Sequence, residues 1–249
     1  MFFDAAASVL SAITLVTLKV YEPPRPGYSK DAKVTQEIVD GLHAVLGNKI
    51  LRVLTLCACF DNIIEAGVFA PLFILYAYQE MGINAVTIGF IIAAEGAGAL
   101  LGALMTVKIT RRTGVFGAIK LVLMISLLAR LLLTCVQGPK LMVVSVLIAA
   151  EFMIGFGRSL FNSNFVSLRQ LLSPEQMLGR VNATVRFVMW AAIPLGSLGA
   201  GLLAQYLGLR ITLFTAACAT IVPTLGMWLL SKSSLATNFD KEIREQLRD

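Results

Sequence analysis

Charged residues are scarce in this chain. Only 14% of its 249 residues are Asp, Glu, Lys or Arg, whereas soluble domains carry about 25%. Apolar runs long enough to cross a bilayer repeat along almost the whole length, which argues against a soluble domain. The sequence therefore predicts an all-α polytopic membrane protein with about seven transmembrane helices.

Residues that support catalysis or metal binding are also few. The sequence has a single histidine, His43, and four cysteines that all lie in apolar segments. This distribution indicates neither a zinc site nor a disulfide framework. The sequence shows no Walker loop and no nucleophile–base pair. We therefore expect a protein that is not an enzyme and uses no cofactor. Its net charge of +6 does not require a nucleic-acid partner in a membrane protein.

Apolar and polar stretches divide the chain into four parts. Residues 1–20 are expected to form a transmembrane helix, because their apolar stretch does not begin with the basic segment that is typical of a secretory signal. A proline-rich cytoplasmic linker is expected at 21–52, and the helical spacing of its apolar residues from 34 predicts an amphipathic surface helix. A polar cytoplasmic tail is expected at 231–249. Six further helices are expected within 53–230, at 53–78, 86–107, 118–136, 141–163, 184–206 and 209–230.

The basic residues fall on alternate connections between these helices. These connections alternate between the two sides of the membrane. Of the 21 Lys and Arg residues, only Lys140 and Arg210 lie on connections of the second side, whereas Arg130 and Arg158 lie inside helices and the rest lie on the first side. Because cytoplasmic loops are enriched in Lys and Arg, the first side is expected to be cytoplasmic. The N-terminus is then expected outside and the C-terminus in the cytoplasm.

One connection carries a recognisable motif. Residues 102–114 read GALMTVKITRRTG. This stretch resembles the cytoplasmic loop motif of the major facilitator superfamily, roughly G-x-L-x-x-x-x-x-D-R-x-G-R, in its second copy. Gly102, Arg112 and Gly114 match the motif, together with Leu104, whereas Arg111 stands at the aspartate position. In the family that aspartate takes part in charge contacts that hold the cytoplasmic gate closed.

A second resemblance covers the last helices. The segments 179–183 (GRVNA), 194–201 (PLGSLGAG) and 207–210 (LGLR) follow Gln170 and Pro174. Their order and spacing are similar to the branch that includes macrolide-efflux and enterobactin-exporter proteins. A complete member has twelve helices. The resemblance therefore implies that this chain corresponds to helices six to twelve, a C-terminal half whose N-terminal half is missing here.

Charged residues inside the expected helices are the candidate site. At about 1.5 Å per residue, Asp61, Glu95 and Glu151 lie near mid-depth of three helices, and Arg130 near mid-depth of a fourth. Glu65 lies four residues after Asp61, on the same helix face. Charges at this depth are costly, so each is a candidate for substrate binding or proton transfer. The alternative is that one acid pairs with Arg130 while the others are solvated. Arg158 is expected to extend toward the cytoplasmic surface.

Small residues predict where helices pack closely. Ala94, Gly98 and Gly102 form one stripe at four-residue spacing, and Gly196, Gly199 and Gly201 form a second group. Small residues allow close helix approach in lipid.

The resemblance implies a secondary transporter in a bacterial inner (plasma) membrane. Its expected activity is proton-coupled efflux of a drug-like or siderophore-like small molecule. The expected partners are that small-molecule substrate, the lipid bilayer and the N-terminal transporter half. The competing interpretation is a truncated or half-size membrane protein without autonomous transport that acts as a partner or scaffold.

Overall fold

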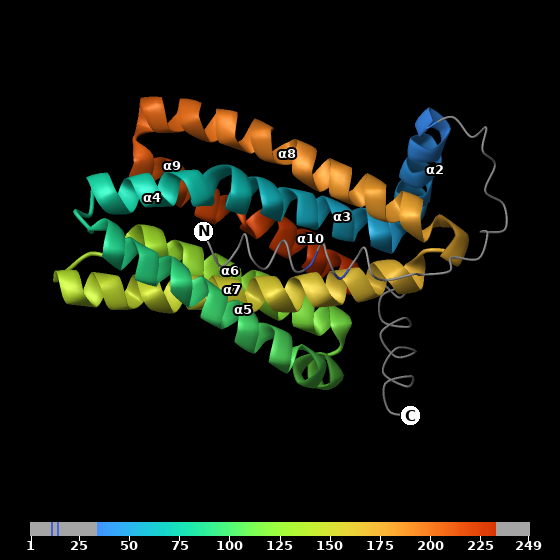
Figure 1. Cartoon of the computed structure of the whole chain (residues 1–249), viewed down its shortest axis with the longest axis horizontal. Coiled ribbons are helices and arrows are strands. Elements are labelled where there is room, and N and C mark those ends of the chain that lie inside the picture. The colour runs from blue at the N-terminus through green and yellow to red at the C-terminus, as the bar shows by residue number, and fades with distance from the viewer. Residues whose placement is uncertain (1–10, 12–13, 15–33, 233–249) are drawn as a thin grey trace. The chain divides into compact units, whose positions relative to one another are not determined.

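The computed structural model describes residues 11, 14 and 34–232, and all regular structure in this part is helical (Figure 1). The expected first helix at 1–20 and the tail at 231–249 lie largely outside the described residues. Residues 1–37 and 38–249 form separate units, and the second unit contains the six spans. The helices are α2 (Val34–Gly47), α3 (Lys49–Asn62), η1 (Ile63–Phe69), α4 (Ala70–Gln79), α5 (Ala85–Thr113), α6 (Val115–Cys135), α7 (Lys140–Leu172), η2 (Glu175–Met177), α8 (Leu178–Leu207), α9 (Leu209–Ala219) and α10 (Ile221–Ser231).

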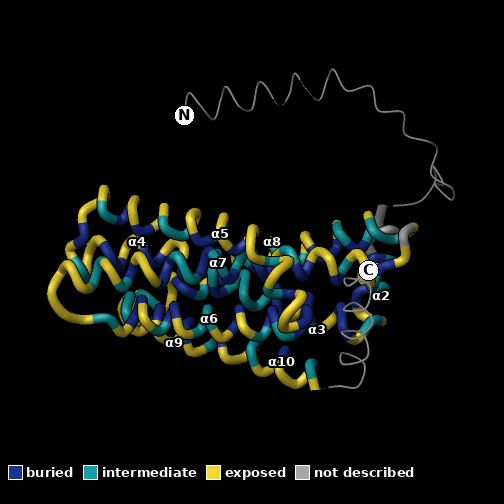
Figure 2. Tube along the Cα trace, turned by 90° about the horizontal axis from the view of Figure 1, so that it is seen from below, coloured by how far each residue is buried: buried dark blue, intermediate teal, exposed yellow. Residues whose placement is uncertain are grey.

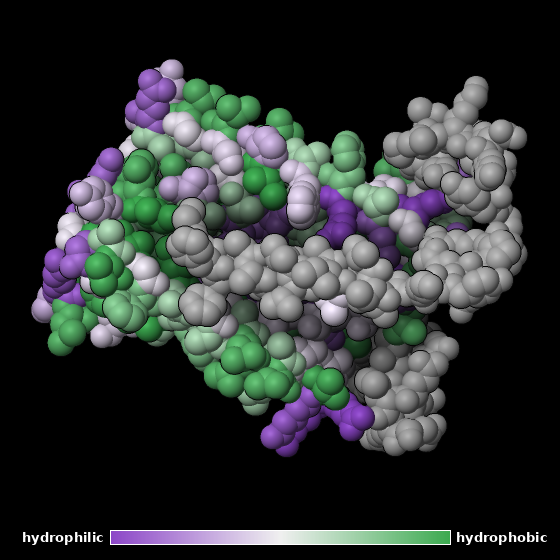
Figure 3. All heavy atoms as spheres, in the orientation of Figure 1, coloured by the Kyte–Doolittle hydropathy of each residue, from purple (hydrophilic) through white to green (hydrophobic). Residues whose placement is uncertain are grey.

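Six helical segments are long and apolar enough to cross a membrane, which confirms the six spans expected within 53–230. They cover Lys49–Gln79, Ala85–Thr113, Val115–Cys135, Lys140–Leu172, Leu178–Leu207 and Leu209–Ser231. Hydrophobic residues cover much of the visible surface of the bundle, and hydrophilic residues gather at its left-hand end and show between the helices farther along (Figure 3). Such a surface suits a helix bundle solvated by lipid.

Side-chain caps and glycines set the span boundaries. The side-chain oxygen of Asn48 accepts from the amides of Ile50 and Leu51 at 3.0 and 3.1 Å, which starts α3. Asn84 caps α5 in the same way through the amide of Thr87. Gly114, with φ of 77°, separates α5 from α6. That φ is unfavourable for residues with a Cβ, so glycine at this motif position has a backbone role.

The first span is interrupted by a π-helical segment. In η1 the helix widens because each amide bonds the carbonyl five residues earlier instead of four, and the amide of Ala70 donates to the carbonyl of Glu65. Pro71 follows at the start of α4. Because proline lacks an N–H and its ring displaces the carbonyl four residues earlier, an ordinary helical ladder cannot continue unchanged through this point. The wider turn contains Glu65, and π-helical turns often occur at functional sites.

Glycines allow α5 and α7 to lie against each other. A Cβ at Gly98 or Gly102 would collide with backbone carbonyls of Phe152 or Phe156, and one at Gly155 would collide with the carbonyl of Glu95. The first predicted stripe therefore marks a true close approach. In the second group, only Gly196 is crowded, against Ile63 and Gly67.

Two apolar cores occupy the two halves of the bundle. One includes Leu54, Ile119 and Phe165 and lies toward α2. The other includes Phe73 and Leu147 and lies toward the opposite end. Each spanning segment runs through both, and buried charged residues lie where the cores meet.

Candidate functional site

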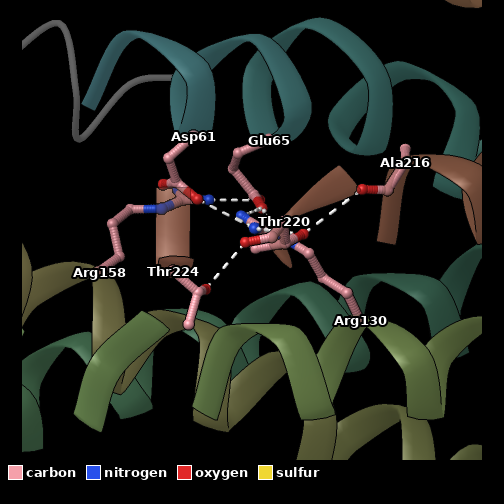
Figure 4. A network of polar contacts seen from close by, with 7 residues as sticks. All are labelled: Asp61, Glu65, Arg130, Arg158, Ala216, Thr220 and Thr224. Carbon is pink, nitrogen blue, oxygen red and sulfur yellow. Dashed lines mark hydrogen bonds and ion pairs between the residues drawn. The ribbon is translucent and has the colours of Figure 1, made fainter. Parts of the chain in front are cut away.

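An ion-pair network joins four of the spans where the two cores meet, and Figure 4 draws all of its residues except Glu95. Asp61 comes from α3 and Glu65 from η1, whereas Arg130 comes from α6. Arg130 is only 1% exposed. A guanidinium this deeply buried requires anionic partners, because an unpaired charge in an apolar interior is strongly destabilising.

Arg130 binds both carboxylates of the first span. Its Nη1 donates to Oδ1 of Asp61 at 2.9 Å, and its Nη2 donates to Oε2 of Glu65 at 2.7 Å. Its Nε also donates to Oε2 of Glu65, at 3.2 Å. The hydroxyl of Thr220 accepts a further bond from Nη1 at 3.3 Å. Phe69 adds a cation–π contact, with the guanidinium carbon 5.7 Å from the ring centroid.

Arg158 extends the network to α5. Its Nη2 donates to Oε1 of Glu65, and its Nη1 lies 2.6 Å from Oε1 of Glu95. The order of charges is therefore Asp61, Arg130, Glu65, Arg158, Glu95, with signs that alternate along the series. We call these five residues the ion ladder.

The position of Arg158 differs from the expected surface position. The sequence indicated a span that ends near residue 163, which would place Arg158 close to the cytoplasmic end. The helix α7 instead continues to Leu172, so that Arg158 lies near its middle. Its guanidinium turns toward the carboxylates, although the side chain stays 41% exposed.

Glu151 differs from the acids of the ladder. It is only 8% exposed. It lies close enough to Glu65, Glu95, Arg130 and Arg158 for electrostatic interaction. Within residues 34–232, however, no side chain forms a hydrogen bond or ion pair with its carboxyl group. Among the described residues it is therefore a nearly buried carboxyl without a direct partner.

A cavity of about 170 Å³ opens beside the ladder. Asp61, Glu65, Arg130 and Arg158 line it together with Asn62, whose amide donates to the carbonyl of Met189 at 3.0 Å. Apolar walls come from residues such as Val122, Leu123, Ile154 and Phe161. A concave site with apolar walls and a few convergent charges is typical of small-molecule binding.

Not all of the sequence candidates come together. Asp61, Glu65, Glu95 and Arg130 are joined by ion pairs and Glu151 is adjacent. The motif residues Gly102, Arg111, Arg112 and Gly114 lie elsewhere, in the second half of α5 and its junction with α6. Arg111 and Arg112 are exposed in the last turn of α5, where cations interact favourably with the helix dipole.

Two residues of the candidate site, Thr220 and Arg158, could hardly be predicted from the sequence. Thr220 is an ordinary residue of an apolar helix, and its role as a partner of Arg130 depends on the packing of α6 against the last span. Arg158 had a weak signal, since it follows Glu151 by seven residues and shares its helix face. Among the described residues, no three His, Cys, Asp or Glu side chains are placed to hold a metal ion.

Comparison with known proteins identifies the fold family. No curated protein matches the chain. The family model of the Major Facilitator Superfamily matches residues 55–247, a range that contains the ion ladder, Glu151 and the cavity. The chain therefore belongs to the Major Facilitator Superfamily, a family of membrane transporters.

Proposed function

We propose that this chain is the C-terminal half of a secondary transporter that exports a drug-like small molecule in exchange for protons. The observation that carries the proposal is the ion ladder, which places several charges beside a cavity in the interior of a membrane bundle. Charges at such depth are costly to retain and mark substrate or proton pathways.

The charge of the site favours a positively charged substrate. Asp61, Glu65, Glu95 and Glu151 supply four carboxyl groups, whereas Arg130 and Arg158 supply two cations. With all groups ionised the site carries an excess of negative charge. An anionic siderophore-like compound would be repelled, so a cationic drug-like compound suits the site better.

Glu151 is the residue best suited to exchange a proton. The ladder acids each have a guanidinium partner, which stabilises their ionised form. Glu151 has no such partner within residues 34–232, and an unpaired charge at its position is costly. Its remaining 8% exposure gives water or a proton donor limited access.

Competition for the arginines would couple the proton to the substrate. With Glu151 protonated, both arginines remain on the ladder and Asp61 is occupied. Loss of the proton leaves a carboxylate near Arg130 and Arg158. This carboxylate attracts the two guanidinium groups and weakens their ion pairs with the ladder acids. Asp61, the more exposed of the two carboxylates bound to Arg130, then becomes available to a cationic substrate. Proton release and substrate binding would therefore favour each other, as antiport requires.

The assignment as a half-transporter rests on the loop motifs and on surfaces that the described chain leaves uncovered. In the most apolar window of α8 only 11% of residues are buried, compared with 50% in α6. Large side chains such as Phe187, Trp190 and Leu195 are exposed on α8. Exposed positions recur along the trace of α8 in Figure 2. Lipid and an N-terminal half would share these faces, with the end that carries α2 in the cytoplasm of a bacterial cell.

A screen of efflux with and without a proton gradient tests this function. The complete transporter, with its N-terminal half, would be expressed in cells and challenged with cationic and anionic fluorescent compounds. We expect gradient-dependent efflux of cations and at least a tenfold reduction for Asp61→Asn at equal expression. The control is Glu175→Gln, which makes a comparable acid-to-amide change outside the spans. Unchanged efflux by Asp61→Asn would remove Asp61 from the mechanism.

A further inference from the structure

A second cavity lies at the end of the bundle remote from α2. Its volume is about 320 Å³, within the range of small-molecule sites. Three connections surround it, those between α4 and α5, between α6 and α7, and between α8 and α9, which meet at the left-hand end in Figure 1. Its lining residues include Tyr76, Glu80, Gln137, Lys140 and Arg210.

The two basic residues of these connections both line this cavity. Lys140 and Arg210 are the only Lys or Arg residues at 80–85, 136–140 and 207–210. Basic residues are thus rare in these three described connections, yet both of those present converge on one cavity. Two dispersed surface lysines or arginines would not be expected to do so.

Neither cation is neutralised by an ion pair within the described residues. Nζ of Lys140 donates to the carbonyl of Gly82 at 3.1 Å, and Nε of Arg210 donates to the carbonyl of Thr134 at 3.3 Å. The side-chain oxygen of Gln137 accepts from the terminal nitrogens of Arg210 when its amide is oriented to satisfy both groups. All these acceptors are neutral, so both cations keep their charge and have N–H groups to spare.

We infer that this cavity binds an oxyanion, specifically a phosphate group held by Lys140 and Arg210. Among the described residues, Glu80 is the one acidic residue on the lining, so the cavity carries a net single positive charge, which matches a phosphodiester. The cavity lies where helices end, at the level expected for lipid headgroups. The same chemistry would accept free inorganic phosphate. This site is separate from the ion ladder and does not depend on the proposed transport activity.

Thermal unfolding of the purified full chain in an uncharged detergent tests the site. Three additions would be compared at equal ionic strength: inorganic phosphate, phosphatidylglycerol and the zwitterionic lipid phosphatidylcholine. We expect phosphatidylglycerol or phosphate to raise the unfolding temperature in a saturable way and phosphatidylcholine to have a smaller effect. Saturation by phosphatidylglycerol alone identifies a lipid headgroup, whereas saturation by phosphate identifies a free-anion site.

Two charge-removing variants make the test specific. Lys140→Gln removes an exposed side chain that contacts one carbonyl, so it should fold normally and weaken the apparent affinity about tenfold. Arg210→Gln should weaken it at least as much. The matched control is Lys49→Gln, an exposed lysine at the other end of the bundle. The control should show the same rise in unfolding temperature as the wild type. The proposal is overturned if neither anion raises the unfolding temperature of the wild type, or if Lys140→Gln keeps the affinity of the Lys49→Gln control.

Discussion

Nη2 of Arg130 lies 2.7 Å from Oε2 of Glu65. Arg130 comes from α6, the third span, and Glu65 from a π-helical turn in the first span, and they are 65 positions apart. The contact fixes the depth at which two spans pack. It also places the most buried cation of the described chain beside the cavity that we assign to the substrate.

Arg130→Met should destabilise the protein strongly. The substitution leaves Asp61 and Glu65 without their buried cation, and breaking such a pair costs about 3–5 kcal/mol. Adding Asp61→Asn and Glu65→Gln should recover part of the loss, because the stranded charges are then removed as well. Unfolding in mixed detergent with SDS measures the difference. If Arg130→Met alone were as stable as the wild type, the ion pairs of Arg130 would contribute nothing to the free energy of unfolding.

Arg158 and Glu95 should be energetically coupled. Their nitrogen and oxygen are 2.6 Å apart, but both side chains are partly exposed, so we expect a coupling free energy of about 0.5–1 kcal/mol. A double-mutant cycle with Arg158→Gln and Glu95→Gln measures it by equilibrium unfolding. Additive effects would support the simple surface position that the sequence suggested for Arg158.

Gly155→Ala should disrupt the packing of α5 on α7. The added methyl group would meet the carbonyl of Glu95, and overpacking of this kind costs about 1–3 kcal/mol. Gly96→Ala is the control, because nothing lies within 4 Å of its added Cβ. That control should be neutral or more stable by up to about 1 kcal/mol, since alanine favours helix. Equal unfolding temperatures for the two variants would contradict the close approach.

Gly41→Ala should loosen α2 from α8. A Cβ there would collide with the hydroxyl of Thr184, beside the ion pair between Asp40 and Arg180. Gly47→Ala, in the same helix, is the control because its Cβ meets nothing. Hydrogen exchange in residues 38–46 should accelerate in the first variant alone. Equal exchange in both would mean that Gly41 does not set the docking of this helix.

The helical fold could be predicted from sequence because lipid imposes a simple rule. Each span must satisfy its own backbone hydrogen bonds and present apolar side chains, and hydropathy records both requirements. The residues at which the helices end were less predictable. The helix α7 continues through polar residues such as Asn164 and Ser167 as far as Leu172, because a helix can extend beyond the apolar layer.

The residues of the candidate site could be picked out from sequence, but their arrangement could not. Asp61, Glu65, Glu95, Glu151 and Arg130 stand out because charges in apolar spans are rare. Their pairing depends on the rotation and depth of separate helices, and on the extra width of the turn at 63–69. Sequence spacing within one helix carries no such information. That Glu151 has no ion-pair partner within residues 34–232 likewise depends on where other helices place Arg130 and Arg158.

The central claim is that Glu151 exchanges the proton that drives transport. The most direct measurement is proton movement per substrate molecule, with a pH-sensitive dye inside vesicles that hold the complete transporter and a cationic substrate identified by the efflux screen. The wild type should move protons across the membrane in the direction opposite to the substrate. Glu151→Gln is permanently neutral, like the protonated acid, so Asp61 should stay occupied by Arg130. This variant should therefore bind the cationic substrate weakly and move no protons. Undiminished proton movement in Glu151→Gln would contradict the account.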